Sequence, residues 1–213
     1  MASFRNKDGR VIVDNLISMI QENAAHLSDI DLTISDGDHG ISMKKGFMTC
    51  RERLEGKEVD LSMALKILGE ALFVELDGVM GRLYGTFFQE MANACQECDI
   101  IDARIFGKML HAAITGIQSI SQAKVGDKTL MDTLIPALTA YENALDARTS
   151  FSEALQDMTA AAEIGKNSTK NLIAKIGRAS CLGERSRGVL DTGATSCWLI
   201  LRSMATTITA LLK

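Results

Sequence analysis

The chain has 213 residues, of which 46% are apolar and 23% are charged, and its formal net charge is −4. This length allows one domain with a sizeable core, and the weakly acidic charge, spread without long runs, argues against a nucleic-acid-binding surface. No apolar stretch reaches the roughly 18 residues of a membrane span, the N-terminus lacks a secretory apolar segment, and the cysteines lack the spacing of a disulfide framework. We therefore expect a reduced, cytoplasmic protein without a membrane-spanning segment.

Helical periodicity recurs through most of the chain. The first stripe, with apolar residues at three-to-four spacing, runs from Val11 to Ile20. The same spacing predicts seven further helices, at residues 42–54, 61–76, 83–98, 102–119, 129–145, 152–174 and 191–213. Ser152 is the expected N-cap of the helix at 152–174. Because no convincing strand, linker or internal repeat is visible, we predict an all-α single domain, an antiparallel bundle of about eight amphipathic helices over residues 1–213.

A cluster of carboxylates follows the first predicted helix. Asp31, Asp36 and Asp38 surround a turn that contains Gly37 and is followed by Gly40. A helix would point these side chains in different directions, whereas glycine gives a loop the backbone freedom to bring them together. Converging carboxylates repel one another unless a cation lies between them, and oxygen ligands suit magnesium or calcium. Magnesium usually completes its shell with phosphates, so the segment indicates a nucleotide site. The alternative is a solvated acidic turn.

Three later loops are rich in glycine or arginine. Residues 77–88 place glycines around a helix start, where free N–H groups favour phosphate, although glycines also mark close helix crossings. Residues 125–134 form a turn that leads into a helix, and we favour a purely structural role for it. Residues 177–194 form a long polar loop with several arginines, which suit bidentate phosphate contacts. Of the three histidines, only His39 lies in the acidic loop, and we expect His26 and His111 at the surface or as satisfied core residues.

The four loops together resemble a known family. The runs Asp-Gly-Asp-His-Gly, Leu-Tyr-Gly-Thr-Phe-Phe, Gly-Asp-Lys-Thr and Gly-Arg-Ala-Ser-x-Leu-Gly-Glu-Arg-Ser are similar, in this order, to those of the nucleotide-binding L subunit of dihydroxyacetone kinases, which is the C-terminal domain in single-chain forms. The match extends over about residues 10–210. The resemblance implies an eight-helix antiparallel barrel that binds ADP or ATP at one end through Mg2+ ions.

The resemblance also implies a role for individual residues. Asp31, Asp36 and Asp38 match magnesium ligands, which would hold two ions that bridge the phosphates. The positions that match the family's nucleotide contacts are His39, Gly40, Ile41, Ser42, Val79, Met80, Leu130, Arg178, Asp191, Thr192 and Gly193. No catalytic residue is assigned beyond this site. In the family, a separate K subunit holds the ketose covalently through a histidine. The phosphoryl donor is either exchangeable ATP or a phosphotransferase-system protein that rephosphorylates bound ADP. We expect no activity without the K-type partner, and a homodimer is left open.

The phosphate turn departs from the family pattern Gly-Gly-x-Ser-Gly-Pro-Leu-Tyr-Gly. Met80 stands in place of the serine, Asp77 in place of a glycine and Arg82 in place of the proline. Loss of a hydrogen bond to a charged group costs about 1.5–3 kcal/mol. Other departures are Ser35, Ser42 and Thr192. The sequence thus leaves two main hypotheses, an active subunit of a dihydroxyacetone or related short-ketose kinase and a catalytically impaired paralogue that binds nucleotide and a partner. A kinase subunit for acyl groups is a third, weaker reading, and the full-length match favours the ketose.

Overall fold

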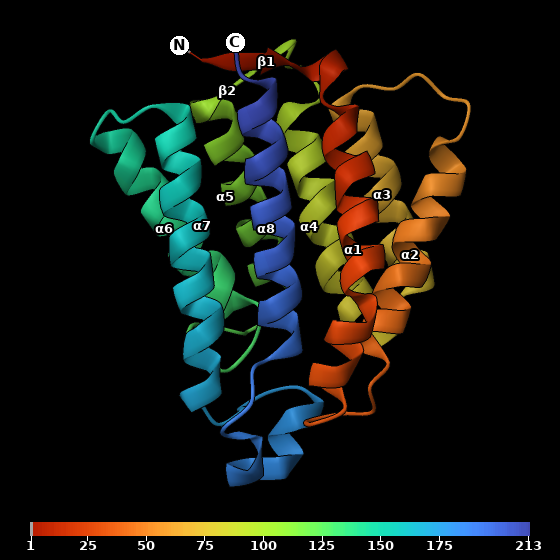
Figure 1. Ribbon diagram of the computed structural model, residues 1–213, viewed down its shortest axis with the longest axis vertical. Helices are drawn as coiled ribbons and strands as arrows, with labels where there is room; N and C mark the ends of the chain where they lie inside the picture. Colours follow the sequence, from red (N-terminus) through yellow and green to blue (C-terminus); the bar gives the residue numbers. More distant parts are fainter. Residues whose placement is uncertain (1) are drawn as a thin grey trace.

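The computed structural model describes residues 2–213, which form eight α-helices (Figure 1). The helices are α1 (Arg10–Asp31), α2 (His39–Leu54), α3 (Leu61–Glu75), α4 (Gly78–Cys95), α5 (Ala103–Ile120), α6 (Met131–Asp146), α7 (Phe151–Ser168) and α8 (Thr192–Leu211). Most connections are short, and a long one joins α7 to α8. Short 3-10 helices lie at Asn6–Asp8, Thr169–Asn171 and Arg178–Ser186. The predicted all-α class and the number of long helices are confirmed. Among residues 2–213, no helix is long and apolar enough to cross a membrane.

The helices run up and down and close into a ring. Each packs against its neighbour in the chain, and α8 packs against both α7 and α1, between which it lies in Figure 1. Consequently α1, α3, α5 and α7 all end where α2, α4, α6 and α8 begin. The connections between these helices gather at that end, and the two chain termini lie at the other (Figure 1). The topology therefore brings the acidic loop, the glycine-rich turn and the arginine-containing loop to one end of the barrel.

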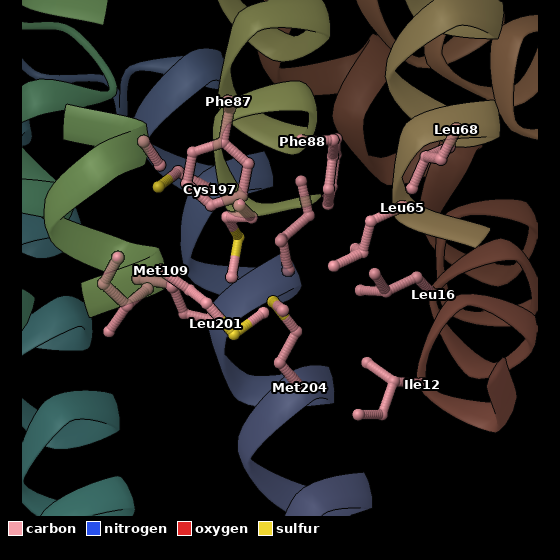
Figure 2. Packing of buried hydrophobic residues seen from close by; sticks show 14 of the residues in the cluster. Ile12, Leu16, Leu65, Leu68, Phe87, Phe88, Met109, Cys197, Leu201 and Met204 are labelled. Atoms are coloured by element: carbon pink, nitrogen blue, oxygen red, sulfur yellow. The ribbon is translucent and has the colours of Figure 1, made fainter. Parts of the chain in front are cut away.

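The inside of the barrel is filled with apolar side chains. Figure 2 shows residues from α1, α3, α4, α5 and α8 that meet at its centre: Ile12, Leu16, Leu65, Leu68, Phe87, Phe88, Met109, Cys197, Leu201 and Met204. Phe87 and Phe88 pack edge to face, with ring centroids 4.9 Å apart. Such close packing leaves a solid core rather than a channel. A polar ligand therefore has no site inside the barrel.

The start of helix α4 and two short strands differ from the sequence prediction. Helix α4 begins at Gly78 and not at residue 83, so the predicted glycine-rich turn is its first turn. Gly78 has a φ of +65°, and a Cβ on Gly81 would lie 2.1 Å from the carbonyl oxygen of Leu76. Strands β1 (Ser3–Arg5) and β2 (Ile100–Asp102) were not predicted, and they pair antiparallel at the end that carries the termini.

The start of helix α7 tests the cap assignment. The prediction that Ser152 caps this helix was wrong, because Ser150 is the N-cap and forms a capping box with Glu153. Its hydroxyl accepts a hydrogen bond from the Glu153 amide at 3.2 Å, and the Glu153 carboxylate accepts one from the Ser150 amide at 2.8 Å.

We expect the Ser150→Ala variant to unfold with a free energy about 1 kcal/mol lower than the unchanged chain, because it loses the side-chain acceptor of the box. Ser152→Ala is the matched control and should cost nothing measurable, since alanine is the better residue inside a helix. Urea unfolding followed by circular dichroism measures both, and equal losses would contradict the assignment of Ser150.

Candidate functional site

Three carboxylates converge where α1 ends. Asp31 is the last residue of α1, Asp36 lies in the connecting loop, and Asp38 is the N-cap of α2. One oxygen from each carboxylate lies within 4.8 Å of those of the other two. Asp31 is buried, with 7% of its surface exposed, whereas Asp36 is exposed and Asp38 is half-buried. The loop thus brings the predicted ligand set together with its open side toward solvent.

Two hydrogen bonds fix the buried carboxylate. The Gly37 amide donates to Asp31 Oδ2 at 2.9 Å, and the Thr192 hydroxyl at the start of α8 donates to Asp31 Oδ1 at 3.2 Å. Gly37 has a φ of +80°, a conformation that glycine adopts without strain. The orientation of Asp31 is therefore set by its own loop on one side and by a distant helix on the other.

Arg178 supplies positive charge to the exposed pair. Its guanidinium Nη1 donates to Asp36 Oδ2 and lies 3.4 Å from Asp38 Oδ2. Burial raises the pKa of Asp38, and a hydrogen bond with Asp36 raises it further. Burial acts in the same direction on Asp36, but its bond with Asp38 and the charge of Arg178 outweigh it, so the pKa of Asp36 is lowered. The two carboxyls therefore titrate as a coupled pair in which Asp36 holds the negative charge more firmly.

The chemistry of this cluster fits a hard divalent cation. All three donors are carboxylate oxygens, and two magnesium ligands on opposite sides of one ion lie about 4 Å apart, close to the spread of the cluster. Four helices also begin at this end of the barrel. Their N-termini carry free amide groups and partial positive charge, which favour phosphate. The same surface can therefore hold a cation and the anion that the cation would neutralise.

The residues that follow the carboxylates lie in two environments. His39 is buried against α4 and α8, with Nε2 3.0 Å from the hydroxyl of Ser196. Burial, aided by Arg178, lowers the pKa of His39 to about 4, so its ring is neutral at physiological pH. A Cβ on Gly40 would lie 1.9 Å from the carbonyl oxygen of Ala24, so the close approach of α1 and α2 requires glycine there. Ile41 is exposed and Ser42 is half-buried.

The other predicted nucleotide contacts lie at the starts of α4, α6 and α8. Val79 is exposed, Met80 is half-buried and Leu130 is buried. Asp191 caps α8, where its carboxylate accepts a hydrogen bond from the Ala194 amide at 2.7 Å, and burial raises the pKa of Asp191 to about 7. Gly193 lies against Leu130, since a Cβ on it would lie 3.8 Å from that side chain. The predicted set therefore divides into exposed positions and buried ones that shape the end of the barrel.

Sequence reasoning missed two polar residues that organise the site. The Tyr84 hydroxyl lies 2.6 Å from the hydroxyl of Ser196 and donates to the Gly193 carbonyl oxygen at 3.1 Å. Together with His39 they form a buried polar network between α2, α4 and α8. Tyr84 lies inside the Leu-Tyr-Gly run, which was available as a signal, whereas Ser196 lies in a helix with ordinary apolar spacing. His26 and His111, by contrast, are exposed.

Comparison with known proteins shows the family of this chain. The family model of the DAK2 domain matches residues 33–206, and the chain therefore belongs to the DAK2 domain family. The chain is 38% identical over 189 residues to the ADP-binding subunit DhaL of PEP-dependent dihydroxyacetone kinase 1 from Listeria innocua, covering 88% of this chain and 89% of that one. It is 34% identical to the corresponding DhaL subunit of Escherichia coli, covering 84% of this chain and 86% of that one. The resemblance noted in the sequence is thus confirmed.

A solved structure shares the fold. The dihydroxyacetone kinase of C. freundii superimposes with a TM-score of 0.70 and 22% identity, and the match covers 93% of this chain and 34% of that longer one. The same kinase in complex with AMP-PNP and Mg2+ gives a TM-score of 0.67. At this identity the likeness shows the fold, namely the helical barrel as part of a larger chain.

Because Arg178 pairs with Asp36 and Asp38, we expect its replacement to change the affinities for free metal and for nucleotide in opposite directions. Arg178→Met should raise the affinity for Mn2+ alone by roughly twofold to fivefold, because two carboxylates lose a competing cation of modest strength. If Arg178 contacts phosphate, as the family resemblance implies, the same change should weaken binding of Mg·ADP by roughly tenfold, since a charged donor is lost.

Titration calorimetry measures both affinities. Arg185→Met, which changes an exposed arginine of the same loop, is the matched control and should alter neither. A fall in the affinity for free Mn2+ in the Arg178 variant would show that the arginine supports the cation site rather than competing for it.

Proposed function

We propose that this chain is the ADP- or ATP-binding subunit of a dihydroxyacetone kinase, or of a related short-ketose kinase, and that residues 1–213 form its single L-type domain. In this proposal a separate K-type subunit holds the ketose covalently, and the present chain delivers the phosphoryl group from Mg-bound nucleotide. The observation that carries the proposal is the convergence of Asp31, Asp36 and Asp38 where four helices begin. The similarity to two DhaL subunits over most of both chains supports it.

In this proposal, different residues of the site hold the metal and contact the phosphates. Asp31, Asp36 and Asp38 would hold Mg2+, and the ion would neutralise the charge of the phosphates. Arg178, which pairs with Asp36, would donate to the same phosphates. The exposed Val79 lies in the first turn of α4, where amides have no partner within the helix. Phosphoryl transfer depends chiefly on such positioning and charge stabilisation, so the site needs no nucleophile of its own.

The packed core limits where an acceptor can approach. Since the inside of the barrel is filled, the ketose has to reach the phosphates from outside the barrel end. This fits a substrate carried by a partner and a chain that is inactive alone. We extend the proposal to two magnesium ions, to a donor that is either ATP or a phosphotransferase-system protein, and to a cytoplasmic enzyme. A homodimer is compatible with it.

A turnover assay tests the proposal. The chain, combined with a K-type subunit, dihydroxyacetone and Mg·ATP or a phosphotransferase-system donor, should form the phosphorylated ketose. Asp36→Asn should reduce the rate by more than roughly a hundredfold while the helical signal is unchanged, because changing even the outer partners of metal ligands costs 10- to 100-fold. Asp29→Asn, which neutralises a nearby exposed carboxylate, is the matched control and should keep activity. Binding of Mg·ADP without turnover from any donor would refute the kinase role.

The start of α4 favours a second candidate, an impaired paralogue that binds nucleotide as a regulatory or partner-binding protein. Asp77 and Arg82 are exposed there, and Met80, half-buried, occupies the position of the family's serine. The carboxylate of Asp77 stands where the family has a glycine, and the thioether of Met80 stands where it has a serine hydroxyl. Both changes lie beside the expected phosphates.

If this second candidate is correct, Met80→Ser should raise the Mg·ADP affinity by roughly tenfold, the gain expected from one hydrogen bond to a charged group. Met63→Ser, the same change on exposed surface of α3, is the control. Calorimetry and the turnover assay serve as readouts, and robust activity that Met80→Ser leaves unchanged would exclude impairment.

A further inference from the structure

Lys128 is a buried lysine in the connection between α5 and α6. Only 2% of its surface is exposed, and its backbone φ is +63°, a left-handed conformation that is unfavourable for a residue with a Cβ. Burial lowers the pKa of Lys128, while the charges of Asp191 and Asp132 act to raise it. A buried cation in a strained conformation persists only where its surroundings compensate for both costs.

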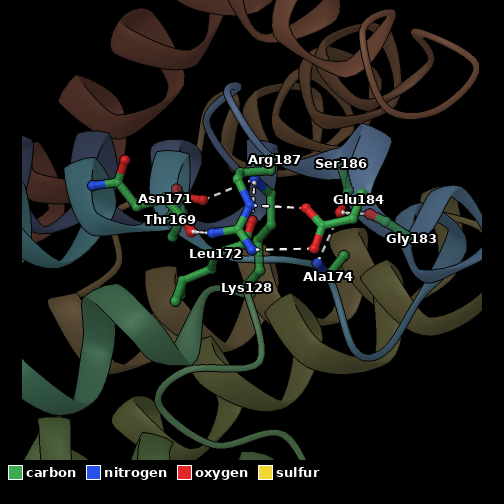
Figure 3. Close-up of polar contacts among 9 residues, drawn as sticks. All are labelled: Lys128, Thr169, Asn171, Leu172, Ala174, Gly183, Glu184, Ser186 and Arg187. Atoms are coloured by element: carbon green, nitrogen blue, oxygen red, sulfur yellow. Dashed lines mark hydrogen bonds and ion pairs between the residues drawn. The ribbon is translucent and has the colours of Figure 1, made fainter.

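The compensation comes from three backbone carbonyls. The Lys128 ammonium donates to the carbonyl oxygens of Val189 at 2.6 Å, Thr169 at 2.8 Å and Leu172 at 3.4 Å. Figure 3 shows Lys128 together with Thr169 and Leu172. An ammonium has three N–H donors, so its hydrogen-bonding capacity is used in full. We call residues 170–188 the arginine loop. Thr169 immediately precedes this segment, Leu172 lies near its start, and Val189 immediately follows it. One side chain therefore joins the two ends of this loop.

Other contacts also join the two ends of this loop, and we call the region where the ends meet its neck. The Gly188 amide donates to the Lys170 carbonyl oxygen at 2.8 Å, and Arg187 Nη1 donates to the Asn171 carbonyl oxygen at 2.7 Å. Further along, the Ala174 amide donates to the hydroxyl of the buried Ser186 at 2.9 Å, as Figure 3 shows. Hydrogen bonds therefore join the two ends of the loop, as the ends of an Ω-loop lie close together.

The outer part of the arginine loop carries Arg178. From there its guanidinium reaches Asp36 and Asp38, across the end of the barrel. Lys128 lies at the base of the loop and makes its hydrogen bonds to the backbone on both sides of the neck. It acts on the position of Arg178 through the backbone that joins them.

We propose that Lys128 is a positioning residue that clamps the neck of the arginine loop and thereby places Arg178 over the acidic cluster. The effect of Lys128 on nucleotide binding rests on the proposed function, because the proposed function assigns Arg178 to the phosphates. The clamping of the loop by Lys128 does not depend on the proposed function. The two parts are therefore measured separately, by hydrogen exchange of the loop and by binding of Mg·ADP.

The central variant is Lys128→Met in the full chain, which keeps the length of the side chain and removes the three donors. Amide exchange within residues 172–188 should become roughly tenfold faster, since the neck loses the ammonium that bonds the backbone on both of its sides, while exchange in the core of α1 and α8 stays unchanged. Lys124→Met, at an exposed lysine of the same connection, is the matched control and should leave exchange unchanged. Lys128→Arg, which retains charge and donors, should recover most of the protection.

A double-mutant cycle with Arg178→Met tests whether Lys128 acts through the arginine. Lys128→Met should weaken Mg·ADP binding by roughly tenfold. The double variant should nevertheless bind no more weakly than Arg178→Met alone, because the two changes remove the same interaction, that of Arg178 with phosphate. Additive losses would show that Lys128 supports binding by another route and would overturn the positioning role. Faster loop exchange with unchanged Mg·ADP affinity would overturn it as well.

The outcomes also separate the clamp from the proposed function. Unchanged exchange in Lys128→Met would refute the clamp, even if the unchanged chain binds Mg·ADP. Failure of the unchanged chain to bind Mg·ADP, with faster exchange in the variant, would refute the nucleotide site and leave the clamp standing. Should Lys128→Met fail to fold, Ser186→Ala removes a neutral hydrogen bond of the same neck, and it should speed exchange in the loop by a smaller factor.

Discussion

The mutual repulsion of three carboxylates at one end of the barrel is the constraint on which the site depends. Asp31, Asp36 and Asp38 are held within 4.8 Å of one another although like charges at that distance oppose each other. The chain offsets the repulsion with hydrogen bonds to Asp31, with the guanidinium of Arg178, and with helix N-termini at the same end. These are also the features that would recognise phosphate, so the electrostatic requirement of the fold and the chemistry of the proposed site coincide.

The barrel topology explains why these features meet. In an up-and-down ring of eight helices, connections alternate between the two ends, so segments far apart in sequence become neighbours. The apolar interior then leaves the ends as the places for polar groups. At the opposite end the strands β1 and β2 join the N-terminal segment to the connection before α5. One end is therefore closed by backbone pairing, and the other carries the charged loops.

Much of the fold was readable from sequence, and the exceptions have physical reasons. Apolar spacing located the long helices, and the glycines beside Asp36 and Asp38 indicated a turn that brings carboxylates together. The start of α4 was missed because Gly78 and Gly81 look like turn residues, although Gly78 is the first residue of the helix and Gly81 packs closely against the carbonyl oxygen of Leu76. The strands are three residues long, too short for a periodic signal. Lys128 was missed because its acceptors are backbone carbonyls 41, 44 and 61 positions away, which leave no trace in side-chain pattern.

The first turn of α8 is where the four sequence motifs become one unit. Immediately before it, Val189 accepts a hydrogen bond from Lys128, and the Asp191 amide donates to the hydroxyl of Thr169. Thr192 then binds Asp31, and the Gly193 carbonyl accepts from Tyr84. The acidic loop, the start of α4, the connection before α6 and the arginine loop are thus each tied to the same short stretch of chain. A change in any one motif can shift the others through this stretch, so the motifs are expected to act as a coupled set rather than as four independent contacts.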